Sequence, residues 1–160
     1  MNKLKSIEEL QGIINRAIEE VDLPLEPSEL YNPIRYILSL GGKYLRPNLV
    51  LMAADMYQFD LIKVMPQALG VELFHNFTLM HDDIMDEAPI RRGETTVHEK
   101  WNTNVAILSG DVLFVKAYQL IVKAETRFLH KIVALFNKTA IEVCEGQQLD
   151  MNFETQVDVS

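Results

Sequence analysis

Three aspartates stand close together near the middle of the chain, in the segment His-Asp-Asp-Ile-Met-Asp at residues 81–86. Asp82 and Asp86 are four residues apart, so on a helix their carboxylates lie on one face, about one turn from each other. Two negative charges at this spacing repel, and a helix alone gains nothing from them. A divalent cation reverses that balance. Mg²⁺ suits such a pair, because it takes one or two carboxylates together with water and phosphate oxygens.

Cationic residues follow the aspartates after a short interval. Pro89 ends the expected helix at or before Ala88, and Arg91, Arg92 and Gly93 come next. Guanidinium groups are suited to binding phosphate through paired hydrogen bonds. Acids that can hold a metal, beside arginines that can hold phosphate, indicate a metal-bridged phosphate or diphosphate ester. The alternative is a solvated helix end, which is the usual environment of an isolated Asp-Asp-x-x-Asp segment.

The same helix presents an apolar strip below the aspartates. His75 lies seven residues before Asp82, two turns back on roughly the same face, and Phe74, Phe77 and Thr78 lie between or beside these two residues. One helix face therefore offers acid at its end and largely apolar side chains beneath. This arrangement predicts that the phosphate ester carries an apolar group.

A second cationic motif precedes this helix, with the sequence Gly-Gly-Lys-Tyr-Leu-Arg-Pro at residues 41–47. Two glycines allow a tight turn or a close approach of the backbone to a ligand, and Pro47 suits the first position of a helix. Helix N-termini favour phosphate, and Lys43 and Arg46 would stand beside this one. The alternative is an ordinary turn between helices with solvated cations.

Hydrophobic periodicity predicts helices for most of the chain and shows no convincing strand alternation. Ser6 with Glu9 forms a capping box, and the last long helix but one is apolar enough to be buried on most sides. Asp111 within that helix is interpreted as a structural carboxylate, or alternatively as a group behind a metal ligand. The fold class is predicted to be all-α, a bundle of long helices with function at one end. Helices are expected at residues 6–21, 28–40, 47–58, 64–87, 97–101, 105–124 and 126–149, with loops at 88–95 and 151–160.

Composition narrows the class of protein. Apolar residues make up 48% of the chain, enough for a folded domain. The net charge of −8, from 15 basic and 23 acidic residues, argues against general nucleic-acid binding. The single cysteine, Cys144, allows no disulfide within the chain and fits a reducing compartment. No apolar run approaches the roughly 18 residues of a membrane span, so we expect one cytoplasmic domain over residues 1–160.

Together and in this order, the motifs at 41–47, at His75, at 81–86 and at 91–93 resemble those of the trans-isoprenyl diphosphate synthases, or polyprenyl synthetases. Ser109-Gly110-Asp111 and Gly146-Gln147 also resemble later landmarks of that family. The resemblance covers nearly the whole chain, and the set of motifs is highly specific. It implies the isoprenoid synthase fold, with this chain as its N-terminal half.

The resemblance implies two substrates, one of which is isopentenyl diphosphate. Its diphosphate would be bound by Lys43, Arg46 and His75, with Gly42 close by and Arg92 assisting. These residues are the ones whose types and positions already indicated phosphate binding.

The other implied substrate is an allylic diphosphate. Asp82 and Asp86 would hold Mg²⁺ ions that bridge to it, with Asp83 as a neighbour or partial ligand, and Arg91 would contact it directly. Catalysis would rest on Asp82, Asp86 and Arg91, which stabilise the leaving diphosphate as charge develops on it. The double bond of isopentenyl diphosphate would attack the resulting allylic cation. A proton would then be lost to the departing diphosphate, with water kept out.

Product length would be set beneath the aspartates. Thr78 is one turn below Asp82, Phe77 is beside it, and Phe74 is a further turn down. A growing chain would meet the two phenylalanines early. The expected product is therefore geranyl, farnesyl or geranylgeranyl diphosphate rather than a long polyprenyl chain.

One part of the family pattern does not occur in this sequence. The family carries a second aspartate-rich motif in its C-terminal half, and the residues around Asp150, Glu154 and Asp158 do not reproduce it. The chain is therefore expected to be a truncated synthase domain that is inactive alone. The last two helices would lack partners for their apolar faces, which favours self-association as a homodimer.

Two other classes of protein were weighed. A non-catalytic binding or regulatory subunit with the same fold could lose its charged motifs, but Lys43, Arg46, Asp82, Asp86 and the paired arginines all remain. A class I terpene cyclase shares the aspartate motif but not the motif at 41–47 or Arg-Arg-Gly. A synthase is therefore favoured over both.

Overall fold

The computed structural model describes residues 5–153, and most of these residues are helical. The all-α fold class expected from the sequence is confirmed. Two compact units are distinguished, one running to Lys123 and the other starting at Ala124. The first contains helices α1 to α6 and a short hairpin, and the second contains α7. The elements are α1 (Ile7–Glu19), α2 (Ser28–Ser39), α3 (Leu45–Met56), α4 (Leu61–Met85), β1 (Ile90–Arg91), β2 (Glu94–Thr95), α5 (Val97–Lys100), α6 (Thr103–Ile121) and α7 (Thr126–Phe153).

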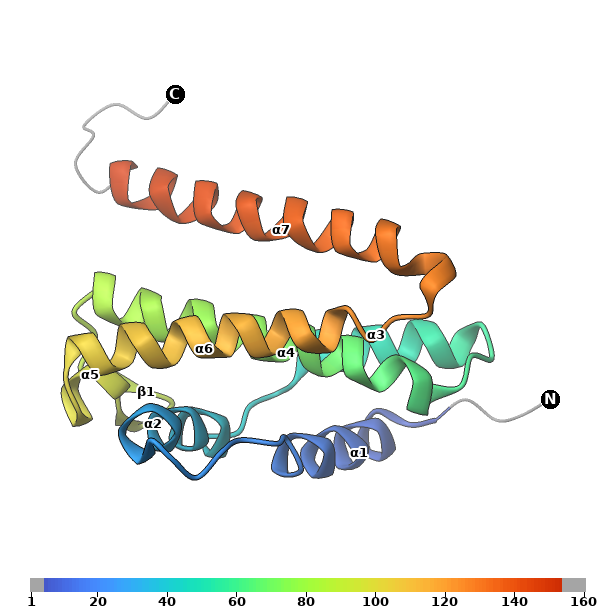
Figure 1. The fold of residues 1–160 in the computed structure, drawn as a ribbon, viewed down its shortest axis with the longest axis horizontal. Coiled ribbons are helices and arrows are strands. Elements are labelled where there is room, and N and C mark those ends of the chain that lie inside the picture. Colours follow the sequence, from blue (N-terminus) through green and yellow to red (C-terminus); the bar gives the residue numbers. More distant parts are fainter. Residues whose placement is uncertain (1–4, 154–160) are drawn as a thin grey trace. The chain divides into compact units, whose positions relative to one another are not determined.

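Helices α4 and α6 form the centre of the first unit and pack side by side (Figure 1). Gly70 of α4 permits this close approach, because the side chain of Ile121 and the carbonyl of Ala117 lie 3.0 and 3.1 Å from where its Cβ would stand. Helix α3 packs on α4, α2 packs on α6, and α1 packs on α3. The start of α4 and α1 lie at one end of this unit, and the hairpin and α5 lie at the other (Figure 1).

Side-chain caps explain where several helices begin. The predicted capping box is present, since the backbone N of Glu9 donates to Ser6 Oγ at 3.2 Å and the backbone N of Ser6 donates to Glu9 Oε2 at 2.7 Å. Helix α4 begins at Leu61 rather than residue 64, because Asp60 accepts a hydrogen bond from the backbone N of Ile62 at 3.0 Å. Such caps satisfy amide groups that the first turn leaves without a helical partner.

The end of α7 differs from the prediction. The helix continues to Phe153, so the expected end at residue 149 is wrong, as is the loop assignment for residues 151–153. The remainder of the predicted loop, residues 154–160, lies outside the described residues.

The hairpin was not predicted, because two-residue strands are too short to show alternation. β1 and β2 pair antiparallel, with Ile90 opposite Thr95 and Arg91 opposite Glu94. The turn residues Arg92 and Gly93 both have positive φ, at 55° and 86°. Positive φ at both central residues is the geometry of tight two-residue hairpin turns, in which glycine is favoured.

Helix α6 is buried on one face rather than on most sides as predicted. Its buried residues are Ala106, Ser109, Gly110, Leu113, Ala117 and Ile121, whereas Leu108 and Val115 are more than half exposed. Within residues 5–153, α6 is the one helix that is long and apolar enough to cross a membrane. Core helices of globular proteins meet the same criterion, and α6 packs against α4.

Candidate functional site

The C-terminal end of α4 carries the predicted acidic residues. Asp82 lies in the last turn and is half-buried, and Asp86 follows the last helical residue and is exposed. Burial raises the pKa of the Asp82 carboxyl above its ordinary value, and the negative charge of Asp86 raises it further, while Arg91 opposes the rise. The two carboxylates therefore lack full compensation by positive charge. A bound cation would supply that compensation.

Asp83 points into a different environment. It is 2% exposed, and its two carboxylate oxygens accept hydrogen bonds from Arg91 Nε at 2.7 and 2.8 Å. The Nη2 atom of Arg91 lies 2.7 Å from Asp83 Oδ1. Charge-assisted pairs with this geometry are strong and directional. The structure thus differs from the expectation that Asp83 is a metal ligand: its oxygens are engaged in fixing Arg91.

The hairpin turn brings Arg92 against the glycine motif. The guanidinium atoms of Arg92 lie 3.1–3.2 Å from the position that a Cβ on Gly42 would occupy. A side chain at Gly42 would therefore push the guanidinium away. Two motifs separated by 50 residues in the sequence meet at this contact, as the phosphate-binding prediction requires.

His75 stands among three arginines. Burial, together with the positive charges of Arg46, Arg92 and Arg91, lowers the pKa of its imidazole to about 4. The histidine is therefore neutral at neutral pH and can donate a hydrogen bond without adding charge. The shift also shows that arginines from the start of α3 and from the hairpin converge on α4. That convergence was predicted from the motifs.

The N-terminus of α3 provides backbone amide groups beside these cations. Tyr44 precedes the helix in the left-handed conformation, with φ of 47°, and its side chain makes no capping hydrogen bond. The Asn48 side-chain amide fixes the preceding loop by donating to the carbonyl oxygens of Tyr44 at 2.9 Å and Lys43 at 3.4 Å. Lys43 and Arg46 are exposed. Uncapped amides and two cations at a helix N-terminus are suited to an anion.

The donor set fits a magnesium ion only in part. Among the described residues, no three His, Cys, Asp or Glu side chains are grouped to hold a metal. Asp82 and Asp86 offer two carboxylates one helical turn apart, with an uncompensated charge on Asp82. Mg²⁺ is commonly held by one or two carboxylates, with water and substrate phosphate oxygens completing its shell. The acidic pair fits that kind of site, in which a phosphate supplies the remaining ligands.

An aromatic cluster lies one to two turns below the acids. The ring of Phe77 lies 5.7 Å from that of Phe74 and 5.2 Å from that of Phe114 on α6, and Tyr118 is 6.0 Å from Phe114. Thr78 directs its hydroxyl to the carbonyl of His75 at 2.8 Å. The predicted apolar strip thus has a second wall on α6. Sequence analysis missed that wall, although Phe114 and Tyr118 are four residues apart on one helix face.

His81 connects the acidic end of α4 to α6. Its Nε2 lies 3.3 Å from the carbonyl of Ile107 and 3.8 Å from Asp111 Oδ1. A Cβ on Gly110 would stand 2.4 Å from the same nitrogen, so only glycine fits there. Asp111 is exposed and reaches the residue beside Asp82. This placement agrees better with the alternative of a group behind a metal ligand than with a buried structural carboxylate.

Glu72 is a further acidic residue that sequence analysis did not single out. It is 2% exposed, and Asn76 Nδ2 donates to its side-chain oxygen at 3.2 Å. Burial raises the pKa of Glu72, while Arg92 and Arg46 oppose the rise. A lone carboxylate on the apolar face of the predicted helix was the signal that could have identified it.

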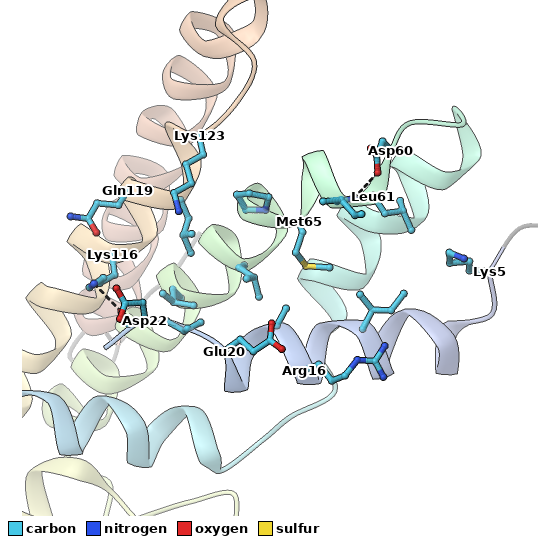
Figure 2. A pocket seen from close by; sticks show the side chains of 18 residues that line it. Lys5, Arg16, Glu20, Asp22, Asp60, Leu61, Met65, Lys116, Gln119 and Lys123 are labelled. Atoms are coloured by element: carbon cyan, nitrogen blue, oxygen red, sulfur yellow. Dashed lines mark hydrogen bonds between the residues drawn. The ribbon is translucent and has the colours of Figure 1, made fainter. Parts of the chain in front are cut away.

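A large cavity lies elsewhere in the first unit, between α1, the start of α4 and the end of α6 (Figure 2). Its volume is about 1040 Å³, and apolar residues such as Met65, Leu69 and Leu73 line it. Lys5, Arg16, Lys116 and Lys123 stand at its margin together with Glu20, Asp22 and Asp60. None of the predicted site residues lines this cavity, so the predicted chemistry and the largest hollow are separate.

Comparisons with known proteins agree with the motifs. A family model described as polyprenyl synthetase matches residues 27–160. The chain is 43% identical to the geranylgeranyl diphosphate synthase of Methanosarcina mazei and covers 100% of this chain and 50% of that protein. It is 38% identical to the geranylfarnesyl diphosphate synthase of Natronomonas pharaonis, over 97% of this chain and 51% of the relative.

A solved structure shows the same correspondence in three dimensions. Geranylgeranyl pyrophosphate synthetase from Geoglobus acetivorans superposes with a TM-score of 0.93 at 37% identity, over 98% of this chain and 52% of that one. The chain therefore spans about half the length of the relatives that it matches.

Proposed function

Since the chain belongs to the polyprenyl synthetase family, we propose that it provides the first aspartate motif and the isopentenyl diphosphate site of a prenyltransferase. The reaction condenses isopentenyl diphosphate with an allylic diphosphate to give a short or medium trans-prenyl diphosphate. The observation that carries this proposal is the convergence of three arginines on His75, next to the uncompensated pair Asp82 and Asp86. Retention of every one of these charges supports an enzyme over a non-catalytic subunit of the same fold.

The residues divide between the two substrates. Lys43, Arg46 and Arg92 hold the diphosphate of isopentenyl diphosphate, neutral His75 donates a hydrogen bond to it, and Gly42 leaves room for the guanidinium of Arg92. Asymmetry of charge keeps this site anionic in preference, because the cations lie on its exposed side.

The allylic diphosphate lies nearer the acids in this proposal. Asp82 and Asp86 hold Mg²⁺, which supplies Lewis-acid stabilisation of the leaving diphosphate when it is bound. Arg91 contacts the same diphosphate, and Asp83 orients Arg91 instead of binding metal. Fixed charges that are in place before the reaction stabilise developing charge without reorganisation.

The aromatic cluster sets product length. Phe74, Phe77 and Thr78 on α4 form the floor of the prenyl site, and Phe114 on α6 closes it from the side. The names of the relatives support a geranylgeranyl-type product. Exposed apolar side chains on α6 and α7, such as Val115 and Leu135, support a cytoplasmic homodimer.

The proposal is tested by incubating the purified protein with Mg²⁺, isopentenyl diphosphate and geranyl diphosphate while its intact mass is measured. A chain of 18.3 kDa is expected to bind both diphosphates without giving product. A longer form that carries a second aspartate motif is expected to release a farnesyl or geranylgeranyl product. Absence of diphosphate binding would overturn the proposal. Product from the 18.3 kDa chain would overturn the requirement for a second motif.

A further inference from the structure

Glu72 is a buried carboxylate close to the proposed diphosphate site. It lies one turn before Asn76 on α4 and is 2% exposed. Its side-chain oxygen accepts a hydrogen bond from Asn76 Nδ2 at 3.2 Å, and the same nitrogen donates to the backbone oxygen of Glu72 at 2.8 Å. This clamp fixes the rotamer of the carboxylate. Burying a charge is costly unless other groups compensate for it.

The compensating groups come from three separate parts of the chain. The charges of Arg92 and Arg46 act on Glu72, and within the described residues neither forms an ion pair with it shorter than 4.0 Å. Tyr44 at the start of α3 also senses the negative charge of Glu72, after its own burial. Glu72 is therefore surrounded by the elements that build the cationic cluster.

The arginines need such a partner when no substrate is bound. Arg46, Arg91 and Arg92 act together on His75, and three guanidinium groups near one point repel one another. Asp83 compensates Arg91 through a direct ion pair. Arg46 and Arg92 have no comparable direct partner among the described residues, but both lie within the field of Glu72.

We propose that Glu72 is a positioning residue of the diphosphate site, which holds Arg46 and Arg92 in place from the buried side while Asn76 fixes Glu72 itself. The inference rests on the proposed function, because the arginines are taken to bind substrate diphosphate. Glu72 does not contact the substrate in this arrangement. The acids of α4 thus have separate roles: Asp82 and Asp86 face the metal, and Asp83 and Glu72 each support arginine.

The sign of one measurement separates positioning from simple electrostatics. Glu72→Gln keeps the shape and the acceptor for Asn76 but removes a negative charge near an anion site. Without positioning, loss of that charge should leave binding of isopentenyl diphosphate unchanged or make it tighter. Positioning predicts weaker binding, by about ten-fold. Glu94→Gln, which removes an exposed negative charge from the hairpin, is the matched control and should not weaken binding.

The experiment measures the dissociation constant of isopentenyl diphosphate by calorimetry for the wild-type chain, Glu72→Gln, Arg92→Ala and the double variant. Thermal unfolding checks that each variant is folded. If Glu72 acts through Arg92, the double variant loses less affinity than the product of the two single losses. Unchanged or tighter binding by folded Glu72→Gln, or losses that multiply fully, would overturn the inference. Absence of binding by the wild-type chain would instead overturn the proposed function.

Discussion

The two ends of α4 differ in how their charged groups are used. At the start of the helix, beside the large cavity (Figure 2), polar groups are satisfied by the chain itself. Asp60 caps α4, and Lys116 Nζ donates to the carbonyl of Asp22 at 3.0 Å. At the other end, burial and repulsion leave Asp82 uncompensated, and cations crowd around His75.

This difference shows that the size of a hollow is a poor guide to chemistry in this chain. The cavity of about 1040 Å³ has mixed charges at its margin and an apolar floor. The acidic end of α4 places like charges together at an energetic cost that a ligand would remove. Perturbed, converging charges mark a functional site more reliably than volume does.

The largest effect is expected from Asp82→Asn. Loss of one of the two acidic ligands should lower the Mg²⁺-dependent affinity for geranyl diphosphate by about 100-fold, as measured by calorimetry. Asp22→Asn, which removes an exposed carboxylate at the cavity end, is the control and should bind as the wild type does. Equal losses in both variants would contradict the distinction between the two ends.

A large loss of stability is expected from Gly110→Ala. The added Cβ would stand 2.4 Å from His81 Nε2, so α4 and α6 must separate locally, at about 1–3 kcal/mol of unfolding free energy. Gly12→Ala is the control, because no atom lies within 4 Å of its added Cβ. In mid-helix it should instead stabilise the protein by about 0.5–1 kcal/mol. Chemical denaturation measures both, and an unchanged Gly110→Ala would refute the packing described for His81.

Gly42→Ala should have a smaller effect that is confined to binding. Its Cβ would meet the guanidinium of Arg92 at 3.1–3.2 Å, and this flexible group can move by a few tenths of an ångström. Affinity for isopentenyl diphosphate should fall by about three- to ten-fold, with little change in the free energy of unfolding. Gly12→Ala again serves as control. Unaltered affinity would show that Arg92 need not lie against the glycine motif.

The pH dependence of stability should change when His75 is replaced. The pKa of about 4 in the folded protein lies below the ordinary value of 6.5, so the unfolded chain binds more protons between these values. The contribution of neutral His75 to stability is complete above pH 6.5 and is lost as the pH falls towards 4. His75→Gln should therefore lose less stability over this range, as judged by urea midpoints. A parallel loss in both proteins would contradict the burial of a neutral imidazole.

The smallest effect is expected from filling the cavity. Ala17→Leu adds volume to the cavity lining on α1 with a good helix former. Affinities for both diphosphates should remain within two-fold of the wild type, about the size of ordinary surface effects. A ten-fold change measured by the same calorimetry would show that the cavity end takes part in substrate binding.

Sequence analysis identified the helices and the two phosphate motifs because their signals are local. Caps, helical periodicity and charged residues at fixed spacing are all visible within a few turns. The hairpin was missed because two residues cannot display a period. The role of Asp83 depends on where Arg91 lies in space, and spacing along α4 alone treats Asp83 like its neighbours.

Residues from distant segments were the hardest to assign. Phe114 faces Phe77 only because α6 packs on α4, and Glu72 gains meaning only when Arg46 and Arg92 are brought to it. The partial burial of α6 was also overestimated, because apolar content does not say which faces of a helix meet a partner.

The most direct test of the account is calorimetric titration of the wild-type chain with geranyl diphosphate, with and without Mg²⁺. The account predicts that Mg²⁺ strengthens binding markedly, because Asp82 and Asp86 hold the ion against the diphosphate. Isopentenyl diphosphate, bound by arginines and His75, should depend far less on the metal. Geranyl diphosphate binding that is indifferent to Mg²⁺, or no binding of either compound, would contradict the assignment of this end of α4 as a metal and diphosphate site.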